Sequence, residues 1–204
     1  INLRIYKGEV CCIFGTSGSG KSTLLNQLAG MEKPTKGQVF IRGKNISDMN
    51  EEELAAFRQE HMSFIFQSYN LLPSMTAVEN VAMPLMFKGM DRKKREAMAE
   101  EMLKRVGLSH RLHHYPSQMS GGQQQRAGIA RAFVSRPEVV FADEPTGNLD
   151  TKTTAEIMDM VMGFARRFNQ TIILVTQDQG MSRYADRIVT LVDGIITGDE
   201  RKGQ

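Results

Sequence analysis

The chain has 204 residues, a length that fits one domain with room for an inserted subdomain. Hydrophobic residues make up 41% and charged residues 24%, which is ordinary for a globular protein that buries a sizeable core. The net charge is +3, from 26 basic and 23 acidic residues. This near balance does not indicate a nucleic-acid-binding surface, so we expect no nucleic acid as a partner. No apolar run approaches the roughly 20 residues that span a bilayer, so we expect no direct membrane insertion.

The chain opens on residues 1–5, which alternate apolar and polar side chains and predict a strand, not the apolar core of a signal peptide. Because this strand begins at the first residue, we expect that further residues precede it. Cys11 and Cys12 are neighbours in the next apolar run and point to opposite faces of a strand. This disfavours a disulfide between them and favours buried, reduced thiols.

The main strands are short apolar, β-branched runs separated by helical patterns, an alternation that predicts a parallel sheet covered on both faces. A further strand, Gln38–Arg42, alternates better and is expected to join residues 1–5 in a small antiparallel sheet. The sequence therefore predicts an α/β fold with a mainly parallel core sheet and a small antiparallel β subdomain. The predicted core strands cover residues 10–14, 62–66, 138–142, 171–175 and 187–192.

Three helices have clear start signals: Asn50 with Glu53 as a capping box, Asp91, and Asp150. The stretch 67–135 is mostly helical and interrupts the strand series. We therefore expect one domain in which residues 1–66 and 136–204 form the core and residues 67–135 an inserted helical subdomain. The methionines of this stretch mark either an adaptable surface or, as the commoner case, core filling; they are Met83, Met86, Met90, Met98 and Met102.

A phosphate-binding loop follows the strand 10–14 and runs into a helical pattern, in the order G-x-x-x-x-G-K-[ST]. Its glycines let successive backbone N–H groups face an anion, and the helix N-terminus adds positive charge. Lys21 is placed to reach the β- and γ-phosphates, and the Ser22 hydroxyl to bind Mg²⁺. The predicted phosphate-binding residues are Gly15, Thr16, Ser17, Gly18, Ser19, Gly20, Lys21, Ser22 and Thr23.

Two acidic residues, Asp143 and Glu144, emerge from the end of the apolar run 139–142. A carboxylate at the end of a neighbouring strand is what a phosphate-binding loop needs to hold its metal, so Asp143 is the predicted metal ligand. Glu144, one residue further on, is well placed to polarise a water for attack on the γ-phosphate. Pro145 argues against the alternative that Glu144 caps a regular helix.

The segment Met119-Ser120-Gly121-Gly122-Gln123 opens a predicted helix to about Val134 and closely resembles the LSGGQ signature of ABC ATPases. Ser120 caps the helix, and the glycines expose backbone N–H groups at its positive end, which forms a second anion site. The resemblance implies that Ser120, Gly121, Gly122 and Gln123 close over ATP held by another protomer, in a head-to-tail dimer with two ATP molecules.

The resemblance extends over the whole chain. Gln67 matches the Q-loop glutamine of the family, which touches Mg²⁺ or the attacking water. The segment 70–81 resembles the part of the family's ATPase subunits that receives a helix of the membrane subunit. Residues 147–150 match the D-loop, whose Asp150 contacts the opposite protomer. The segment 145–150 and the glutamines 123–125 look most like the group that serves lipoprotein release, macrolide or antimicrobial-peptide export, and cell division.

Two departures from the family pattern stand out. Gln177 occupies the place where the family usually has a histidine that contacts the γ-phosphate, and glutamine carries neither a proton nor a positive charge there. We expect ATP binding and dimer closure to survive while turnover falls. In the family an aromatic residue well ahead of the phosphate loop stacks on adenine, and only fourteen residues precede Gly15 here. Tyr6 lies too close to the loop and is interpreted as structural, so we expect the stacking residue to lie upstream of residue 1.

The motifs predict an ATPase with ATP and Mg²⁺ as ligands. The resemblance implies that it works as a homodimer with an integral membrane permease on the cytoplasmic face of the membrane. The alternative is a non-transport ABC protein: a regulator of the cell-division type, or a DNA-repair or translation ATPase. The histidines 110, 113 and 114 could form a metal site, but a polar loop is the favoured interpretation. The basic run 92–95 fits a solvated helix face as well as an anionic partner.

Overall fold

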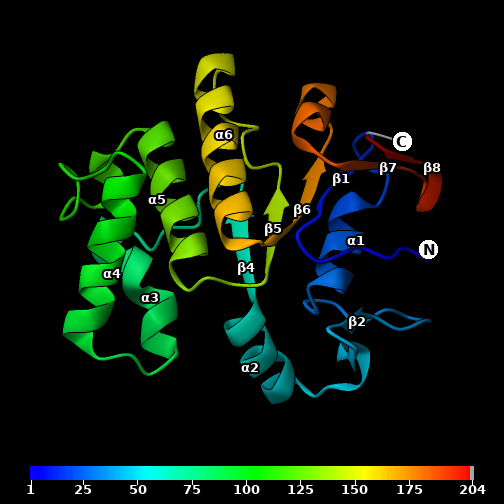
Figure 1. The fold of residues 1–204 in the computed structure, drawn as a ribbon, viewed down its shortest axis with the longest axis horizontal. Coiled ribbons are helices and arrows are strands. Elements are labelled where there is room, and N and C mark those ends of the chain that lie inside the picture. The colour runs from blue at the N-terminus through cyan, green and yellow to red at the C-terminus, as the bar shows by residue number, and fades with distance from the viewer. Residues whose placement is uncertain (203–204) are drawn as a thin grey trace.

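The computed structural model describes residues 1–202, which fold around one six-stranded sheet (Figure 1). The strand order is β4-β5-β6-β1-β7-β8, and every neighbouring pair is parallel except β7 with β8. This confirms the predicted mainly parallel core. The strands are β1 (Val10–Phe14), β4 (Met62–Phe66), β5 (Val139–Asp143), β6 (Thr171–Thr176), β7 (Arg187–Val192) and β8 (Ile195–Arg201).

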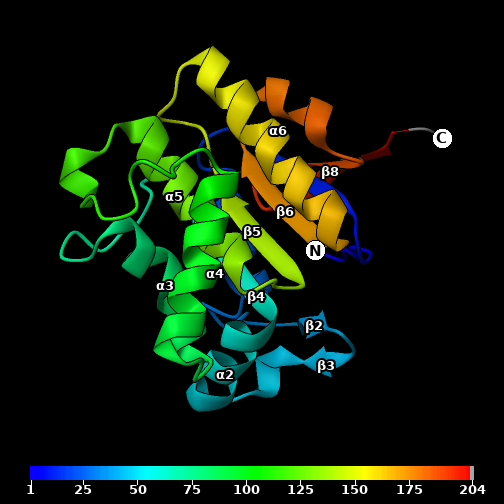
Figure 2. The same cartoon turned by 60° about the vertical axis from the view of Figure 1, so that its left-hand side comes forward.

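A small antiparallel pair, β2 (Phe40–Ile41) with β3 (Lys44–Asn45), forms the second sheet, beside α2 in Figure 2. The small antiparallel sheet was therefore predicted correctly, but the strand that pairs with β2 was not. Residues 1–5 form no strand, and the partner of β2 is β3, which a two-residue turn at Arg42 and Gly43, both with positive φ, places directly beside it.

The helices begin where their capping residues predict. Asn50 and Glu53 form the predicted capping box, and Asp91 and Asp150 each accept two backbone N–H groups. The helices are α1 (Lys21–Leu28), α2 (Glu51–His61), α3 (Ala77–Phe87), α4 (Arg92–Arg105), α5 (Gly121–Val134) and α6 (Thr151–Phe168), with short 3₁₀ turns η1 (Ile46–Asp48), η2 (Pro116–Gln118) and η3 (Gln179–Tyr184).

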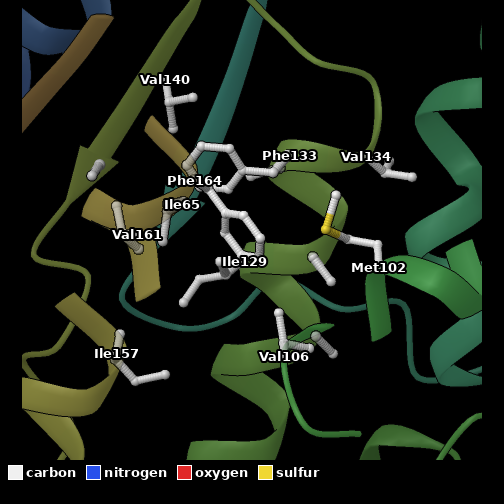
Figure 3. Close-up of a cluster of buried hydrophobic side chains, with 14 of the residues drawn as sticks. Ile65, Met102, Val106, Ile129, Phe133, Val134, Val140, Ile157, Val161 and Phe164 are labelled. Carbon is white, nitrogen blue, oxygen red and sulfur yellow. The ribbon is translucent and has the colours of Figure 1, made fainter. Parts of the chain in front are cut away.

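The central strands β1 and β6 are buried on both faces, and their alternate residues enter two different cores. In β6, Ile172 and Leu174 join the cluster that contains residues of α3 to α6, whereas Ile173 and Val175 join the cluster under α1 and α2. Figure 3 shows part of the first cluster, where the ring centroids of Phe133 and Phe164 lie 5.2 Å apart. A strand buried on both faces reads as a continuous apolar run, as the sequence shows.

Helices α3, α4 and α5 pack against one another at the β4 side of the molecule (Figures 1 and 2). They account for most of the stretch 67–135 that was predicted to be helical. Its methionines divide between the two alternatives: Met102 is buried, whereas Met86 and Met98 are exposed. Within residues 1–202, no helix is long and apolar enough to cross a membrane.

Candidate functional site

Strand register brings the predicted motifs to one edge of the sheet. Phe66, the last residue of β4, pairs with Asp143; Asp143 pairs with Val175; and Thr176 pairs with Phe14. The segments that follow β4, β5, β6 and β1 therefore leave the sheet side by side. In parallel α/β sheets this carboxyl edge is where ligands bind.

The loop between β1 and α1 has the backbone shape of a phosphate cradle. Gly18 and Gly20 have φ values of 81° and 95°, which side chains rarely tolerate. A Cβ on Gly15 would lie 2.4 Å from the Leu191 carbonyl oxygen, so glycine is required there for packing. The Ser19 hydroxyl is buried in the loop without a hydrogen-bond partner among residues 1–202.

Lys21 opens helix α1 and is buried, with its Nζ donating to the Thr16 carbonyl oxygen at 2.7 Å. The lysine therefore folds back over the loop that it is expected to serve, while Ser22 is exposed beside it. Asp143 is half-buried at the end of β5, and burial raises the pKa of its carboxyl group although the nearby Lys21 charge lowers it. A bound cation would favour the ionised carboxylate of Asp143 and offset its burial, so these side chains fit a phosphate–metal ligand.

Glu144 is fixed at both its backbone and its carboxylate. Its φ is 45°, in the left-handed region, and its N–H donates to the Val175 carbonyl oxygen at 2.9 Å. One carboxylate oxygen accepts the Thr176 hydroxyl at 3.0 Å and the other accepts the backbone N–H of Gln177 at 2.9 Å. The sequence pointed to Glu144 but held no signal for these contacts.

Gln67 follows β4 and is paired with Asn148, 81 positions later. The Gln67 Nε2 donates to the Asn148 Oδ1, and the Asn148 Nδ2 donates to the Gln67 carbonyl oxygen, both at 3.2 Å. A Cβ on Gly147 would lie 2.7 Å from the Gln67 Nε2, so this pairing needs glycine at 147. The segment after β4 is thus linked to the segment 147–150 within one chain.

Ser120 is the N-cap of α5, with a capping box in which Ser120 and Gln123 exchange backbone-to-side-chain hydrogen bonds at 3.0 and 3.3 Å. Gly121 and Gly122 form the first turn of the helix, where backbone N–H groups lack helical partners. Figure 1 shows α5 and α1 on opposite sides of strands β4, β5 and β6. The structure therefore does not bring this segment to the phosphate loop of the same chain.

Asp150 lies at the start of α6 and caps it. Its carboxylate accepts the Thr153 hydroxyl at 2.6 Å and two backbone N–H groups, and the Thr153 hydrogen bonds are the main cause of its lowered pKa. Gln177 is exposed directly after β6 and reaches Glu144 through its backbone N–H. The position of Gln177 is therefore next to the predicted base.

Two buried residues of α5 were missed by the sequence analysis. Gln125 is fully buried and donates to the Pro145 carbonyl oxygen, next to Glu144. Arg131 donates to the carbonyl oxygens of Tyr69 and Asn70 at 2.9 and 2.6 Å. Both positions look like an ordinary polar helix face in the sequence, and only the packing shows that they are anchors.

The other candidate features have structural roles. Among residues 1–202, no three side chains of histidine, cysteine, aspartate or glutamate are grouped as metal ligands, and the histidines 110, 113 and 114 lie in the segment between α4 and η2. In the basic run, Arg92 pairs with Glu96 one helical turn away at 2.8 Å, as a solvated helix face would. Cys11 and Cys12 are free and buried, as predicted.

Known proteins resemble this chain over nearly all of its length. A family profile described as ABC transporter matches residues 1–147. The macrolide export ATP-binding/permease protein MacB of Shewanella sp. (strain W3-18-1) is 48% identical over 99% of this chain, which spans only 31% of that relative.

Two further proteins match over most of their own length. The lipoprotein-releasing system ATP-binding protein LolD of Cytophaga hutchinsonii is 45% identical over 96% of this chain and 90% of its own length. Among solved structures, a dimeric post-hydrolysis state of the ATP-binding cassette MJ0796 bound to ADP and Pi has a TM-score of 0.91 and 41% identity, covering 98% of this chain and 88% of that chain.

Proposed function

The chain belongs to the ABC transporter family, and from this we propose that it is the ATP-binding and ATP-hydrolysing subunit of a membrane transporter. The observation that carries the proposal is the common edge of the sheet. The phosphate loop, the Asp143–Glu144 pair and the end of β6 lie side by side there, because their strands pair in register. This arrangement supplies an anion cradle, a metal ligand and a base in one place.

In the proposed reaction, water forms a bond to the γ-phosphorus of ATP while the bond to the β–γ bridging oxygen breaks and ADP leaves. Glu144 accepts the proton of the attacking water. Lys21 leaves the Thr16 carbonyl oxygen and binds the β- and γ-phosphates, and backbone N–H groups of residues 15–23 hold the remaining phosphate oxygens.

We assign the metal to Mg²⁺, held by the Ser22 hydroxyl, the Asp143 carboxylate and the Gln67 carboxamide. When bound, it neutralises charge on the phosphates. The half-buried Asp143 supports this assignment, because its burial disfavours an uncompensated carboxylate. The contact with Asn148 uses the Gln67 Nε2, so it does not occupy the carboxamide oxygen, which is the atom that would bind the metal.

The test separates binding from hydrolysis. Lys21→Ala is expected to weaken binding of radiolabelled ATP by at least about tenfold, and Glu144→Gln to retain binding while phosphate release falls by roughly 100-fold or more. Lys104→Ala and Glu52→Gln, exposed on α4 and α2, are the matched controls. Unchanged phosphate release in Glu144→Gln would remove Glu144 as the base.

We further propose that two copies of the chain form the two ATP sites together. The placement of α1 and α5 on opposite sides of strands β4, β5 and β6 supports this, because the phosphate loop and the segment that opens α5 would then serve different chains (Figure 1). The solved relative is a dimer bound to ADP and Pi, which is a precedent for this arrangement.

The proposed membrane partner is an integral permease that docks beside the Gln67 segment, placing the chain at the cytoplasmic face of the membrane. A groove of about 380 Å³ supports this, because it is lined by apolar side chains such as Met83, Pro84 and Phe87 of α3 and reaches Asn70. Phe87 is 61% exposed, which is unusual for a large apolar side chain.

The names of the relatives, macrolide export and lipoprotein release, support an export or release system without assigning a cargo. A pull-down of the tagged chain from solubilised membranes tests the partner. Recovery of a polytopic membrane protein is expected, and recovery of ribosomes or DNA in its place would point to a non-transport ABC protein.

A further inference from the structure

We propose that Thr176 is a positioning residue that holds the carboxylate of Glu144 in line for hydrolysis. The inference deepens the proposed function and rests on Glu144 as the base. Thr176 lies at the last position of β6, between the strands that carry the phosphate loop and Glu144. Its hydroxyl is the only side-chain group that donates to the Glu144 carboxylate among the hydrogen bonds of residues 1–202.

The Thr176 hydroxyl has a defined direction. Its oxygen accepts the backbone N–H of Asp178 at 3.0 Å, and its own hydrogen is directed to the Glu144 Oε2, also at 3.0 Å. The residue is 1% exposed, so water does not compete for the hydroxyl. A buried, charge-assisted hydrogen bond of this kind is stronger than a neutral one and restricts the carboxylate to one orientation.

The backbone of Glu144 makes this restriction effective. A glutamate with φ at 45° is strained, and such strain persists where the surroundings fix the residue. Here the Glu144 N–H is bound to the Val175 carbonyl oxygen, and the two carboxylate oxygens are bound to the next two residues of the same segment. The end of β6 therefore holds both the backbone and the carboxylate of Glu144.

The arrangement also separates two roles at neighbouring positions. Gln177 holds Glu144 through its backbone N–H, which any residue except proline supplies. Thr176 acts through its side chain, which only serine replaces with the same chemistry at this length. Loss of the Thr176 hydroxyl is therefore expected to misplace the base without disturbing the phosphate loop.

The test compares Thr176→Val, which keeps the shape and removes the hydroxyl, with Thr176→Ser, which keeps the hydroxyl. We expect Thr176→Val to lower kcat for ATP hydrolysis about tenfold with KM for ATP within about twofold, and Thr176→Ser to recover kcat to within about threefold of the parent. This split between kcat and KM, with rescue by serine, is not expected from a purely structural threonine.

The matched control is Thr171→Val at the other end of β6. Thr171 is also buried, and its hydroxyl accepts the Gly8 N–H at 3.0 Å, far along the strand from Glu144. Thermal midpoints of the two valine variants are compared, so that a loss of folding is seen separately. Thr171→Val is expected to leave kcat unchanged.

The outcomes separate this inference from the proposed function. If Glu144→Gln abolishes phosphate release and Thr176→Val keeps the parental kcat, the role of Thr176 is wrong and the proposed function stands. A serine variant as slow as the valine variant also overturns it. If Glu144→Gln keeps the parental rate, the proposed base itself fails.

Discussion

At the scale of single residues, the backbone and the side chain of Gln177 have separate roles. Its backbone N–H binds Glu144, and its side chain is exposed at the carboxyl edge of the sheet. The proposed base is therefore held without the family's usual histidine at this position. What glutamine lacks is the ability to carry a proton or a positive charge beside the γ-phosphate.

Gln177→His is accordingly expected to raise the steady-state rate of ATP hydrolysis, by about tenfold or more, because the backbone contact remains and an imidazole is added. Phosphate release at saturating ATP is the measurement. Gln179→His, two residues further along the same exposed segment, is the control and is expected to change nothing. An unchanged rate in Gln177→His would show that this position does not limit turnover.

At the scale of elements, helix α5 links three parts of the proposed machinery. Ser120 caps its first turn, Gln125 reaches the Pro145 carbonyl oxygen beside Glu144, and Arg131 holds the backbone that follows Gln67. Arg131 is buried, and burial lowers the pKa of its guanidinium group. Its hydrogen bonds therefore compensate a charge taken out of water.

Arg131→Met is expected to lower the free energy of unfolding by about 2–3 kcal/mol, because the carbonyl groups of Tyr69 and Asn70 lose their donors. Chemical denaturation measures the change. Arg105→Met, which removes an exposed pair with Glu101 on α4, is the control and should cost at most about 0.5 kcal/mol. Equal losses in the two variants would contradict the anchoring role of Arg131.

The sequence predicted those elements that are marked by patterns of a few neighbouring residues. The capping box at Asn50, the caps at Asp91 and Asp150, and the glycine loop after β1 are local patterns, and all appear at the predicted places. The sequence analysis missed strand β8, although Asp193 and Gly194 mark a turn before it. Only the first two residues of β8 are apolar, so it does not form the apolar run that marks the other strands.

The contacts of the candidate site were not predictable in the same way. Thr176 and Glu144 are 32 positions apart, and Gln67 and Asn148 are 81 apart. Their meeting depends on which strands are neighbours and in which register, and neither is written in a local pattern. The sequence therefore identified the residue types of the site but not the residues that hold them.

At the scale of the whole molecule, the separation of helix α1 from helix α5 is the feature with the largest consequence for assembly (Figure 1). In the proposed dimer each ATP would touch one chain's loop and the other chain's helix α5. Association is then driven by ATP, and it depends on the charge at the start of α5.

Ser120→Asp tests this without loss of the helix cap, because aspartate caps as well as serine while its negative charge repels the γ-phosphate. In a Glu144→Gln background with ATP, we expect a dimer by light scattering, and a monomer that still binds ATP once Ser120→Asp is added. Ser109→Asp, exposed in the loop after α4, is the control and should still dimerise. A stable dimer in Ser120→Asp would contradict the shared site.

The thiols of β1 have a further consequence. Cys11 and Cys12 are fully buried in the strand that leads into the phosphate loop, between β6 and β7, and burial raises their pKa values to about 12 and about 11. Thiolate forms are therefore scarce at neutral pH, and an alkylating reagent reaches them only when the strand opens. The two cysteines can therefore serve as probes of strand β1, because the rate at which they are alkylated reports how often the sheet opens next to the phosphate loop.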